Sequence, residues 1–227
     1  MKKYVIFDLD DTLLDFNRGE VEGIRQLLRE YQVPDVSAGF QTYLQVNHQV
    51  WEQIEQGANR EQLLNDRFTE TFARLGMTVD GAELERTYSG MLDHNFYTLP
   101  GASTLLADLQ QAGVHLIAGT NGTKATQISR LAGSGVGRYF DDVFISEDVG
   151  YNKPDRRFFQ PIFRRHPNLS QQNALMVGDR LQSDILGAER AELPSVWFNP
   201  HQVENRTTIQ PTFETGSYTE LKQLILA

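Results

Sequence analysis

The spacing of hydrophobic residues divides this chain into three stretches. Residues 5–7 form a short apolar run that stops at Asp8, and their β-branched and aromatic character is typical of a strand covered on both faces. From residue 18 to residue 96, apolar positions recur every three or four residues, which predicts helices throughout. After Leu99 the pattern changes again, to helical stretches that alternate with short β-rich runs.

The helical stretch contains four groups of apolar residues at helical spacing. They are Val21, Ile24, Leu27, Leu28 and Tyr31; Phe40, Tyr43, Leu44, Trp51 and Ile54; Leu63, Leu64, Phe68, Phe72 and Leu75; and Leu84, Tyr88, Met91 and Leu92. Each group can form one buried helix face, so we expect a bundle of about four helices.

The remainder of the chain predicts an α/β fold, a Rossmann-like parallel sheet with helices on both faces. Its β-rich runs are residues 115–119, 142–145, 174–177 and 195–198. Right-handed crossovers would align the carboxyl ends of these strands along the edge that carries Asp8. We therefore expect a core of residues 1–15 and 99–227, with residues 16–98 inserted as a helical cap, a lid over that edge. Residues 200–216 have the composition of a polar surface loop.

Composition narrows the possible functions. The chain has 227 residues, 40% of them hydrophobic, and its 30 acidic against 21 basic residues give a net charge of −9, which argues against binding a nucleic acid polymer. It has no cysteine, so disulfides, thiolate catalysis and thiolate metal ligands are excluded. No stretch approaches the roughly 20 apolar residues of a membrane span. We expect a cytoplasmic protein that does not bind a membrane, and the sequence leaves its oligomeric state open.

Acidic residues follow two of the predicted strands. Asp8 and Asp10 come directly after the first apolar run, and Asp179 follows Gly178 at the end of residues 174–177, with Asp184 five residues later. Asp179 or Asp184 alone could simply cap the next helix. Together with Asp8 and Asp10, they predict an acidic active edge, because α/β folds place their chemistry at the carboxyl ends of strands.

Groups suited to an anion follow two more of the predicted strands, residues 115–119 and 142–145. Thr120, Asn121 and Gly122 precede a predicted helix, where a hydroxyl and free amides can bind an oxyanion, although the same residues are common in turns and caps. Lys153 precedes Pro154, which we expect at the start of a helix. A lysine at such a place is usually a solvated surface charge, but beside carboxylates it would be a counter-charge for phosphate.

Electrostatics connects these groups. Two like charges about 4 Å apart repel by roughly 4 kcal/mol at an effective dielectric of 20, so several carboxylates need compensation to share a cleft. A divalent cation would supply it, and a site with oxygen ligands only favours Mg²⁺. The metal and Lys153 together would make the acidic edge able to accept a phosphate dianion.

The ordered set of motifs resembles haloacid dehalogenase (HAD) superfamily phosphatases that carry a helical cap. The resemblance covers nearly the whole chain and implies a lid over a small phosphorylated metabolite. It implies that Asp8 is the nucleophile, forming an aspartyl-phosphate, that Asp10 is the general acid and base, and that Asp8, Asp179 and the Asp10 carbonyl hold Mg²⁺. Thr120, the Asn121 and Gly122 amides and Lys153 would bind phosphate, and Asp184 would orient Lys153 or a metal-bound water.

Within the superfamily, the carboxylate at Asp10 implies turnover to free phosphate, since dehalogenase-type members lack it. The segments around Thr120, residues 146–150 and residues 184–188 are most similar to pyrimidine 5′-nucleotidase-type members, which implies a nucleoside monophosphate as substrate. The chain departs from many relatives at Glu192, where they have glycine in the turn before the last core strand. This departure concerns the local turn rather than the chemistry.

Substrate preference would depend on the cap. Asn47, His48 and Trp51 fall at helical spacing near its middle, and an aromatic ring could stack on a base. A core tryptophan with two exposed polar neighbours is the simpler interpretation. Arg18, at the hinge after the first motif, could touch phosphate or ribose, or could be a solvated charge.

Two further classes of function stay open. A phospho-receiver signalling module also combines acidic residues, a phosphorylated aspartate, threonine, lysine and Mg²⁺ on a parallel sheet, but an insertion of about 80 residues is far longer than an ordinary loop. The other class is a phosphoglycolate or sugar-phosphate phosphatase, or a phosphoglucomutase-type enzyme, of the same superfamily.

Overall fold

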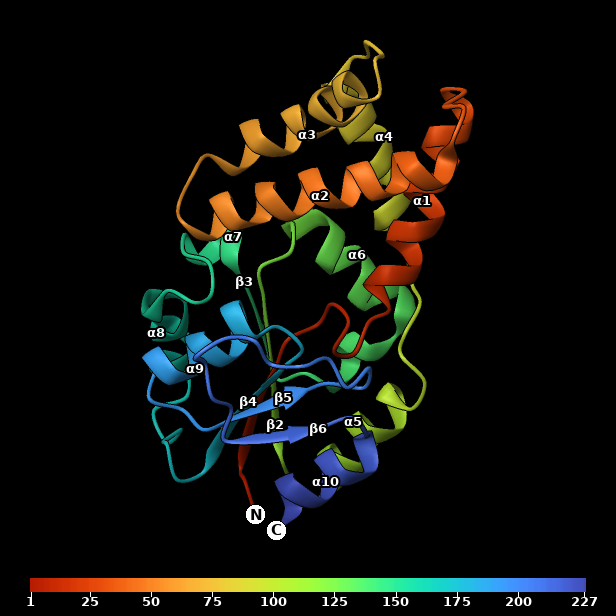
Figure 1. Ribbon diagram of the computed structural model, residues 1–227. Coiled ribbons are helices and arrows are strands. Elements are labelled where there is room, and N and C mark those ends of the chain that lie inside the picture. Colours follow the sequence, from red (N-terminus) through yellow and green to blue (C-terminus); the bar gives the residue numbers. More distant parts are fainter. The chain divides into compact units, whose positions relative to one another are not determined.

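A computed structural model describes residues 1–227 and divides the chain into two compact units (Figure 1). One unit contains residues 1–15 and 96–227, and the other contains residues 16–95. The chain returns to the first unit three residues before the expected position 99. Thr98 forms an isolated antiparallel bridge with Leu14, which ties this stretch to the first unit.

The second unit consists of four helices. They are α1 (Phe16–Glu30), α2 (Val36–Glu55), α3 (Arg60–Arg74) and α4 (Gly81–Asp93). Asp35, Asn59 and Asp80 accept hydrogen bonds from the first amides of α2, α3 and α4, which explains where these helices begin. The four predicted apolar groups lie on these four helices, apart from Tyr31 and Leu75, which come one residue after the ends of α1 and α3. Most members of the groups form one cluster or pack against it.

The first unit alternates strands and helices. In chain order they are β1 (Tyr4–Phe7), α5 (Ala102–Gln111), β2 (His115–Thr120), α6 (Lys124–Ser134), η1 (Val136–Tyr139), β3 (Asp142–Ile145), α7 (Ser146–Val149), α8 (Arg156–Arg165), β4 (Ala174–Gly178), η2 (Leu181–Ile185), α9 (Leu186–Arg190), β5 (Ser195–Phe198), β6 (Phe213–Thr215) and α10 (Tyr218–Leu226).

The strands form one parallel sheet in the order β3-β2-β1-β4-β5-β6. The register pairs Phe7, the last residue of β1, with Ala118 of β2 and Val177 of β4. The next residue, Asp8, still donates its amide to the Val177 carbonyl at 2.8 Å. The carboxyl end of β1 is therefore held between its two neighbours, and this fixes where the first acidic motif leaves the sheet.

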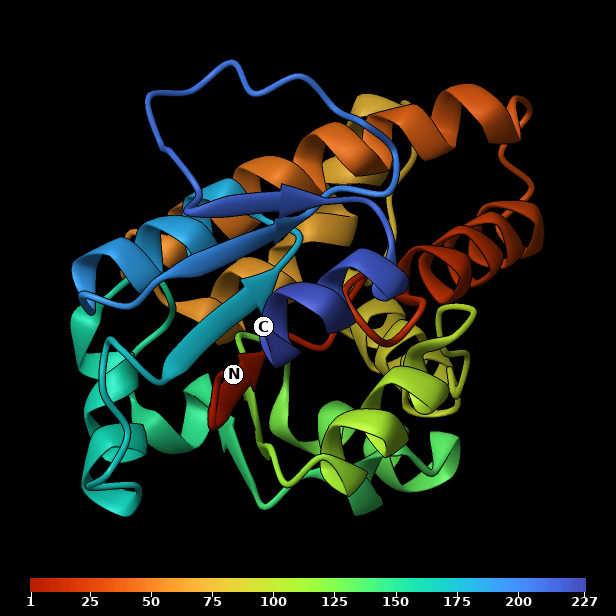
Figure 2. The same ribbon diagram turned by 90° about the horizontal axis from the view of Figure 1, so that it is seen from below.

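Both faces of the sheet are covered, as the apolar run of β1 predicts. Val5 and Phe7 pack into a cluster with α5 and α10, whereas Tyr4 and Ile6 pack on the other face with α8 and α9. Figure 2 shows α10 on one side of the strands and α8 and α9 on the other. The predicted α/β fold with a parallel sheet is confirmed.

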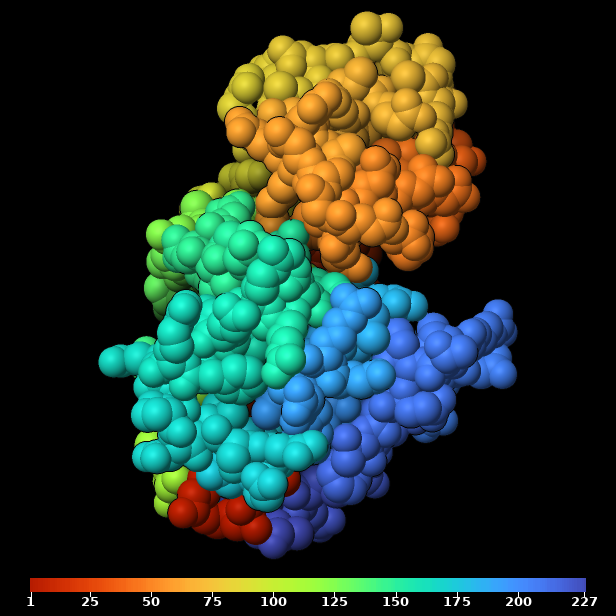
Figure 3. Space-filling view, turned by 90° about the vertical axis from the view of Figure 1, so that its left-hand side faces the viewer, coloured from red at the N-terminus to blue at the C-terminus, as the bar shows by residue number.

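Two local predictions were wrong. Residues 200–216 are not loop throughout, because Phe213–Thr215 form the edge strand β6 beside β5; the preceding segment does lie on the surface (Figure 3). Three residues with two exposed side chains leave no strand pattern to recognise. Pro154 does not begin a helix either: α8 starts at Arg156, with Asp155 as its cap. No helix is both long and apolar enough to cross a membrane.

The turn at Glu192 explains why a glycine suits this position. Glu192 has φ 58°, in the left-handed region that favours glycine. Its side chain forms an exposed ion pair with Arg156, with 3.1 Å between Nη2 and Oε1. An exposed pair of this kind contributes about 0–1 kcal/mol, so it offsets the backbone strain only in part.

We expect Glu192→Gly to raise the free energy of unfolding by up to about 1 kcal/mol. The left-handed conformation costs an L-residue about 1–2 kcal/mol, and the freedom that glycine gains in the unfolded chain returns roughly half of that. Urea unfolding would measure the change, and Arg156→Ala is the control that removes the ion pair alone. A Glu192→Gly protein less stable than Arg156→Ala would contradict the expectation.

Candidate active site

The first acidic motif turns sharply as it leaves β1. Asp11 has φ 53° and donates its amide to the Leu14 carbonyl at 2.7 Å, while the amides of Leu13 and Leu14 both donate to the Leu9 carbonyl. Aspartate is one of the few residue types that enter the left-handed region readily. This turn holds Asp8 and Asp10 at the end of the sheet, and Leu9 between them is buried.

Lys153 joins three of the strand ends. Its ammonium Nζ donates to Asp8 Oδ1 at 2.6 Å, to the Gly119 carbonyl at 2.7 Å and to Asp184 Oδ1 at 2.7 Å. These three bonds use all three ammonium protons. The lysine is 1% exposed, so it is a buried counter-charge and not a solvated surface residue.

Asp184 reaches this cluster from η2, a turn of π-helix after β4. Its Oδ2 accepts the Arg180 amide at 3.0 Å and its Oδ1 accepts Lys153, so both oxygens are held. A Cβ added to Gly178 would lie 2.3 Å from Asp184 Oδ2. The glycine before Asp179 therefore makes room for the Asp184 side chain, and Asp184 orients Lys153.

Asp179 completes a group of three carboxylates. One oxygen each from Asp8, Asp179 and Asp184 lies within 4.8 Å of the others. Thr12 Oγ1 donates to Asp179 Oδ1 at 3.3 Å, and the Trp197 indole donates to the Asp179 carbonyl at 2.8 Å. The structure thus brings the predicted Asp8, Asp179, Asp184 and Lys153 together.

Burial and mutual repulsion dominate the electrostatics of this group. Burial, with the Asp184 and Asp10 charges, raises the pKa of Asp8 to about 7 although Lys153 lowers it. Burial, then Asp184 and Asp8, also raise the pKa of Asp179 well above its ordinary value. For Lys153, burial lowers the pKa, but Asp184 and Asp8 outweigh it and the pKa lies above its usual range.

This donor set fits a hard divalent cation. The carboxylates outnumber the single ammonium, and only oxygen atoms are offered. Lys153 occupies one oxygen of Asp8 and one of Asp184, so Asp8 Oδ2 and the Asp179 carboxylate are the groups best placed to hold Mg²⁺. A cation there would favour the charged form of both carboxylates, against the burial and the mutual repulsion that raise the pKa values of Asp8 and Asp179.

Thr120 lies at the end of β2 with its hydroxyl in a defined orientation. Thr120 Oγ1 accepts the Gly122 amide at 3.0 Å and Gln127 Nε2 at 3.1 Å. A hydroxyl has two lone pairs and one proton, so these contacts leave the Oγ1 proton to donate to an anion. The Gly122 amide itself points to Thr120.

Asn121 positions Lys153 through its backbone. Asn121 Oδ1 accepts the Lys153 amide at 2.8 Å, and Asn121 Nδ2 donates to the Lys153 carbonyl at 2.8 Å. This pair of bonds links the loop after β2 to the loop that carries Lys153. The Asn121 side chain is thus bound to protein, and its backbone amide remains the predicted contact to phosphate.

Asp10 has two partners on α6 that the sequence analysis missed. Gln127 Nε2 donates to Asp10 Oδ2 at 2.6 Å, and Arg130 Nη1 forms an ion pair with Asp10 Oδ1. Gln127 is 1% exposed and Arg130 is fully buried. Polar residues on a helix normally face water, so nothing in the sequence indicated that these two belong to the site. Their i, i+3 spacing shows only that they lie on the same helix face.

In the second unit, Asn47 belongs to a buried polar network that links all four helices. Asn47 Nδ2 donates to Glu20 Oε1 at 3.0 Å, and Asn47 Oδ1 accepts Arg67 Nη1 at 2.9 Å. Arg67 also makes a two-bond ion pair with Glu85, at 2.7 and 2.9 Å. Both polar ends of the Asn47 side chain are bound within its own unit, which gives this residue a structural role.

The other residues singled out in the cap are paired locally. Trp51 is half-buried against Val46, Val50 and Ile54 and their neighbours, with the Arg60 guanidinium 4.9 Å from its ring centroid. Arg18 forms an exposed i, i+4 pair with Glu22 at 3.0 Å, and His48 lies 3.4 Å from Glu52. His48 and Arg18 are exposed, as the simpler interpretation of each has it. Trp51 is half-buried rather than a core residue, and Asn47 is buried rather than exposed, because its amide is bound in the polar network.

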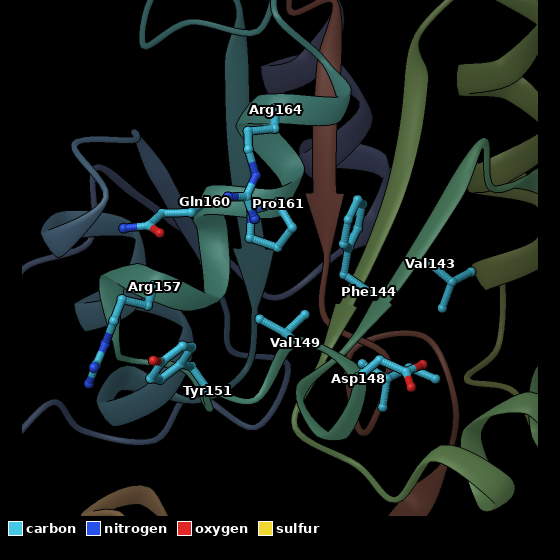
Figure 4. Close-up of a pocket in the computed structure, with 10 residues that line it drawn as sticks. Val143, Phe144, Asp148, Val149, Tyr151, Arg157, Gln160, Pro161 and Arg164 are labelled. Carbon is cyan, nitrogen blue, oxygen red and sulfur yellow. The ribbon is translucent and has the colours of Figure 1, made fainter.

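A separate cavity lies beside β3 and α8 (Figure 4). Its lining includes Tyr151, Arg157 and Arg164, and none of the predicted site residues. The Arg157 guanidinium packs over the Tyr151 ring, with 3.9 Å from Cζ to the ring centroid. It also donates hydrogen bonds to both carboxylate oxygens of Asp155. These partners account for the charge of Arg157.

The sequence model of the haloacid dehalogenase-like hydrolases matches residues 2–192 of this chain. The chain therefore belongs to this family. It is 40% identical to the pyrimidine 5′-nucleotidase PynA of Streptococcus pneumoniae, over 96% of this chain and 93% of that protein. It is also 34% identical to the pyrimidine 5′-nucleotidase YjjG of Escherichia coli, over 98% and 97%.

Solved structures agree with the fold. The crystal structure of the HAD-hydrolase YfnB from Bacillus subtilis bound to magnesium has a TM-score of 0.92, 34% identity and coverage of 100% of this chain and 99% of that one. An L-2-haloacid dehalogenase from Xanthobacter autotrophicus has a TM-score of 0.77 at 18% identity, which shows the fold alone. The predicted family and the prediction that the chain is an enzyme are confirmed, and membership favours a hydrolase over a phospho-receiver.

We expect Arg67→Met to lower the free energy of unfolding by about 3–5 kcal/mol, because it leaves the Glu85 carboxylate buried without its partner. The double variant Arg67→Met/Glu85→Leu should recover most of that loss. Urea unfolding would measure both. Arg74→Met, on the same helix, breaks the exposed Arg74–Glu70 pair and should cost less than about 1 kcal/mol. Additive losses in the double variant would contradict the network described here.

We expect Gly178→Ala to lower kcat at least 10-fold, because the new Cβ displaces Asp184 from Lys153. Gly90→Ala is the matched control: Gly90 is exposed on α4, and a Cβ there would meet nothing within 4 Å. The control should keep its activity and gain about 0.4–1 kcal/mol of stability. Phosphate release assays and thermal unfolding would compare the two. Equal, wild-type turnover in both variants would refute this account of Gly178.

Proposed function

We propose that this chain is a Mg²⁺-dependent phosphomonoesterase that forms an aspartyl-phosphate on Asp8. We further propose that its substrates are pyrimidine nucleoside 5′-monophosphates. The observation that carries the activity is the cluster of Asp8, Lys153, Asp179 and Asp184 at the end of β1, of which all but the half-buried Asp179 are buried. Similarity to two pyrimidine 5′-nucleotidases over almost the full chain supports the substrate class.

Asp8 would attack the phosphorus atom in line with the ester bond. An oxygen–phosphorus bond forms at Asp8 while the bond to the leaving oxygen breaks, and Asp10 gives that oxygen a proton. Asp10 then takes a proton from water, whose oxygen attacks the phosphorus and releases free phosphate from Asp8. Bound Mg²⁺, held by Asp8, Asp179 and the Asp10 carbonyl, would neutralise charge on the phosphoryl oxygens.

The remaining groups would stabilise the transferred phosphoryl group. The Lys153 ammonium would supply positive charge, and the Thr120 hydroxyl and the Asn121 amide would supply hydrogen-bond donors at the same strand ends. The Gly122 amide, predicted as a further donor, instead donates to Thr120 Oγ1 and orients that hydroxyl. Lys153 is already fixed by three hydrogen bonds, so little reorganisation is needed when the phosphate arrives. Residues 16–95 would serve as a substrate lid. Of the three residues first considered for contacts to the nucleoside, Arg18 and Trp51 stay candidates, whereas the side chain of Asn47 is bound within its own unit.

Phosphate release from a substrate panel tests this function. The panel contains pyrimidine and purine monophosphates, sugar phosphates and phosphoglycolate, each assayed with Mg²⁺ and with EDTA. We expect turnover that depends on the metal and is concentrated on pyrimidine monophosphates. Turnover confined to sugar phosphates or phosphoglycolate would move the substrate to that class, and interconversion of glucose phosphates would identify a mutase.

We expect Asp8→Asn to lower turnover by at least about 1,000-fold, because it removes the nucleophile while preserving its size. The wild-type enzyme, quenched in acid during turnover, should carry a phosphoryl group that the variant lacks, as measured by intact mass. Asp141→Asn is the matched control: Asp141 is exposed and faces His115, and its variant should match the wild type. Normal turnover in Asp8→Asn would remove Asp8 as the nucleophile.

A further inference from the structure

Helix α6 turns polar side chains inward and an apolar one outward. Its buried residues are Thr126, Gln127, Arg130 and Leu131, whereas Ile128 is 51% exposed. Burying an arginine and a glutamine costs free energy unless each gains specific partners. The inward face of α6 is therefore arranged for particular contacts rather than for apolar packing.

Those contacts converge on Asp10. Arg130 Nη1 binds Asp10 Oδ1, and Gln127 Nε2 binds Asp10 Oδ2 at 2.6 Å, so each carboxylate oxygen has its own donor. Asp10 keeps a side-chain exposure of 27%, while Arg130 behind it has none. The Asp10 carboxylate is thus bound by two buried side chains of α6, and its exposed part is accessible to a reactant.

Gln127 also connects Asp10 to the candidate phosphate site. The same Nε2 that binds Asp10 donates to Thr120 Oγ1 at 3.1 Å, which uses both of its protons. A carboxylate only accepts hydrogen bonds, so the amide nitrogen must face Asp10. A Cβ on Gly122 would lie 2.1 Å from Gln127 Nε2, and glycine there leaves the space that Gln127 occupies.

We propose that Arg130 and Gln127 are positioning residues that hold the Asp10 carboxylate for proton transfer and tie it to Thr120. This inference rests on the acid and base role of Asp10 in the proposed function. A proton donor must lie within hydrogen-bond reach of the leaving oxygen, and a small displacement lowers its effect strongly. Two donors, one on each oxygen, fix both the place and the rotation of the carboxylate.

Two substrates with different leaving groups can distinguish this positioning role from general structural support. Uridine 5′-monophosphate needs a proton on its leaving oxygen, whereas p-nitrophenyl phosphate releases a stable anion without one. Phosphorylation of Asp8 by p-nitrophenyl phosphate should then be independent of Asp10. Hydrolysis of the aspartyl-phosphate still needs Asp10 to take a proton from water, so the two steps respond differently.

We would measure the burst of p-nitrophenol and the steady turnover of both phosphate esters in Arg130→Met and Gln127→Met. The burst rate should stay within about 3-fold of the wild type, while steady turnover of uridine 5′-monophosphate falls about 10- to 100-fold, a part of the whole contribution of a general acid. Arg130→Lys keeps the charge and should restore part of the loss. Arg138→Met, an exposed arginine just beyond α6, is the control and should match the wild type.

A double-mutant cycle with Asp10→Asn decides the inference. If Arg130 and Gln127 act through Asp10, their variants should cost less than about 2-fold more in the Asp10→Asn background. Equal losses in both backgrounds, or loss of the burst in proportion to turnover, would overturn the positioning role and leave the proposed function intact. Wild-type turnover in Asp10→Asn alone would overturn the role of Asp10, and the positioning with it. Thermal unfolding of each variant verifies that the proteins compared are folded. If Arg130→Met does not fold, the same measurements on Gln127→Met test the inference.

Discussion

The buried ammonium group of Lys153 is the contact on which the arrangement of the strand ends depends. A fully buried cation is tolerated only when its charge and all of its protons have partners, and here these are Asp8, Asp184 and the Gly119 carbonyl. The partners come from β1, from the turn after β4 and from β2. One side chain therefore fixes the ends of three neighbouring strands relative to one another.

This contact is possible because backbone space has been left for it. Gly178 has no side chain where Asp184 lies, and Gly122 has none where Gln127 lies. In both places a glycine at a strand end admits a buried polar side chain from the following turn or helix, which then binds a charged group of the site. In these two motifs the glycines are needed for the space that the neighbouring side chains occupy.

The parallel sheet and the residues that meet at its edge could be predicted from the sequence. The continuous apolar run of β1 indicates burial on both faces, and in a parallel sheet Asp8, Thr120 and Asp179 must then share an edge. The partners of Asp10 could not be predicted in the same way. On α6 the apolar Ile128 is exposed and the charged Arg130 is buried, the reverse of what hydrophobic periodicity assumes. Asn47 was similarly ambiguous, because an asparagine bound inside a helical bundle and one that faces a ligand have the same spacing.

The two carboxylates of the first motif lie in different environments, as the two proposed roles require. Asp8 is 6% exposed, shares its cation with Asp184 and lies beside Asp179, so its environment resembles a metal and phosphoryl site. Asp10, two residues later, is turned toward α6, where an arginine and a glutamine hold it while one side stays open to solvent. A nucleophile needs a fixed position next to the charge it will carry, and a proton carrier needs access to the leaving oxygen and then to water. The two side chains thus have different partners although they are two residues apart, and for this reason one short motif would be able to serve both steps of the proposed hydrolysis.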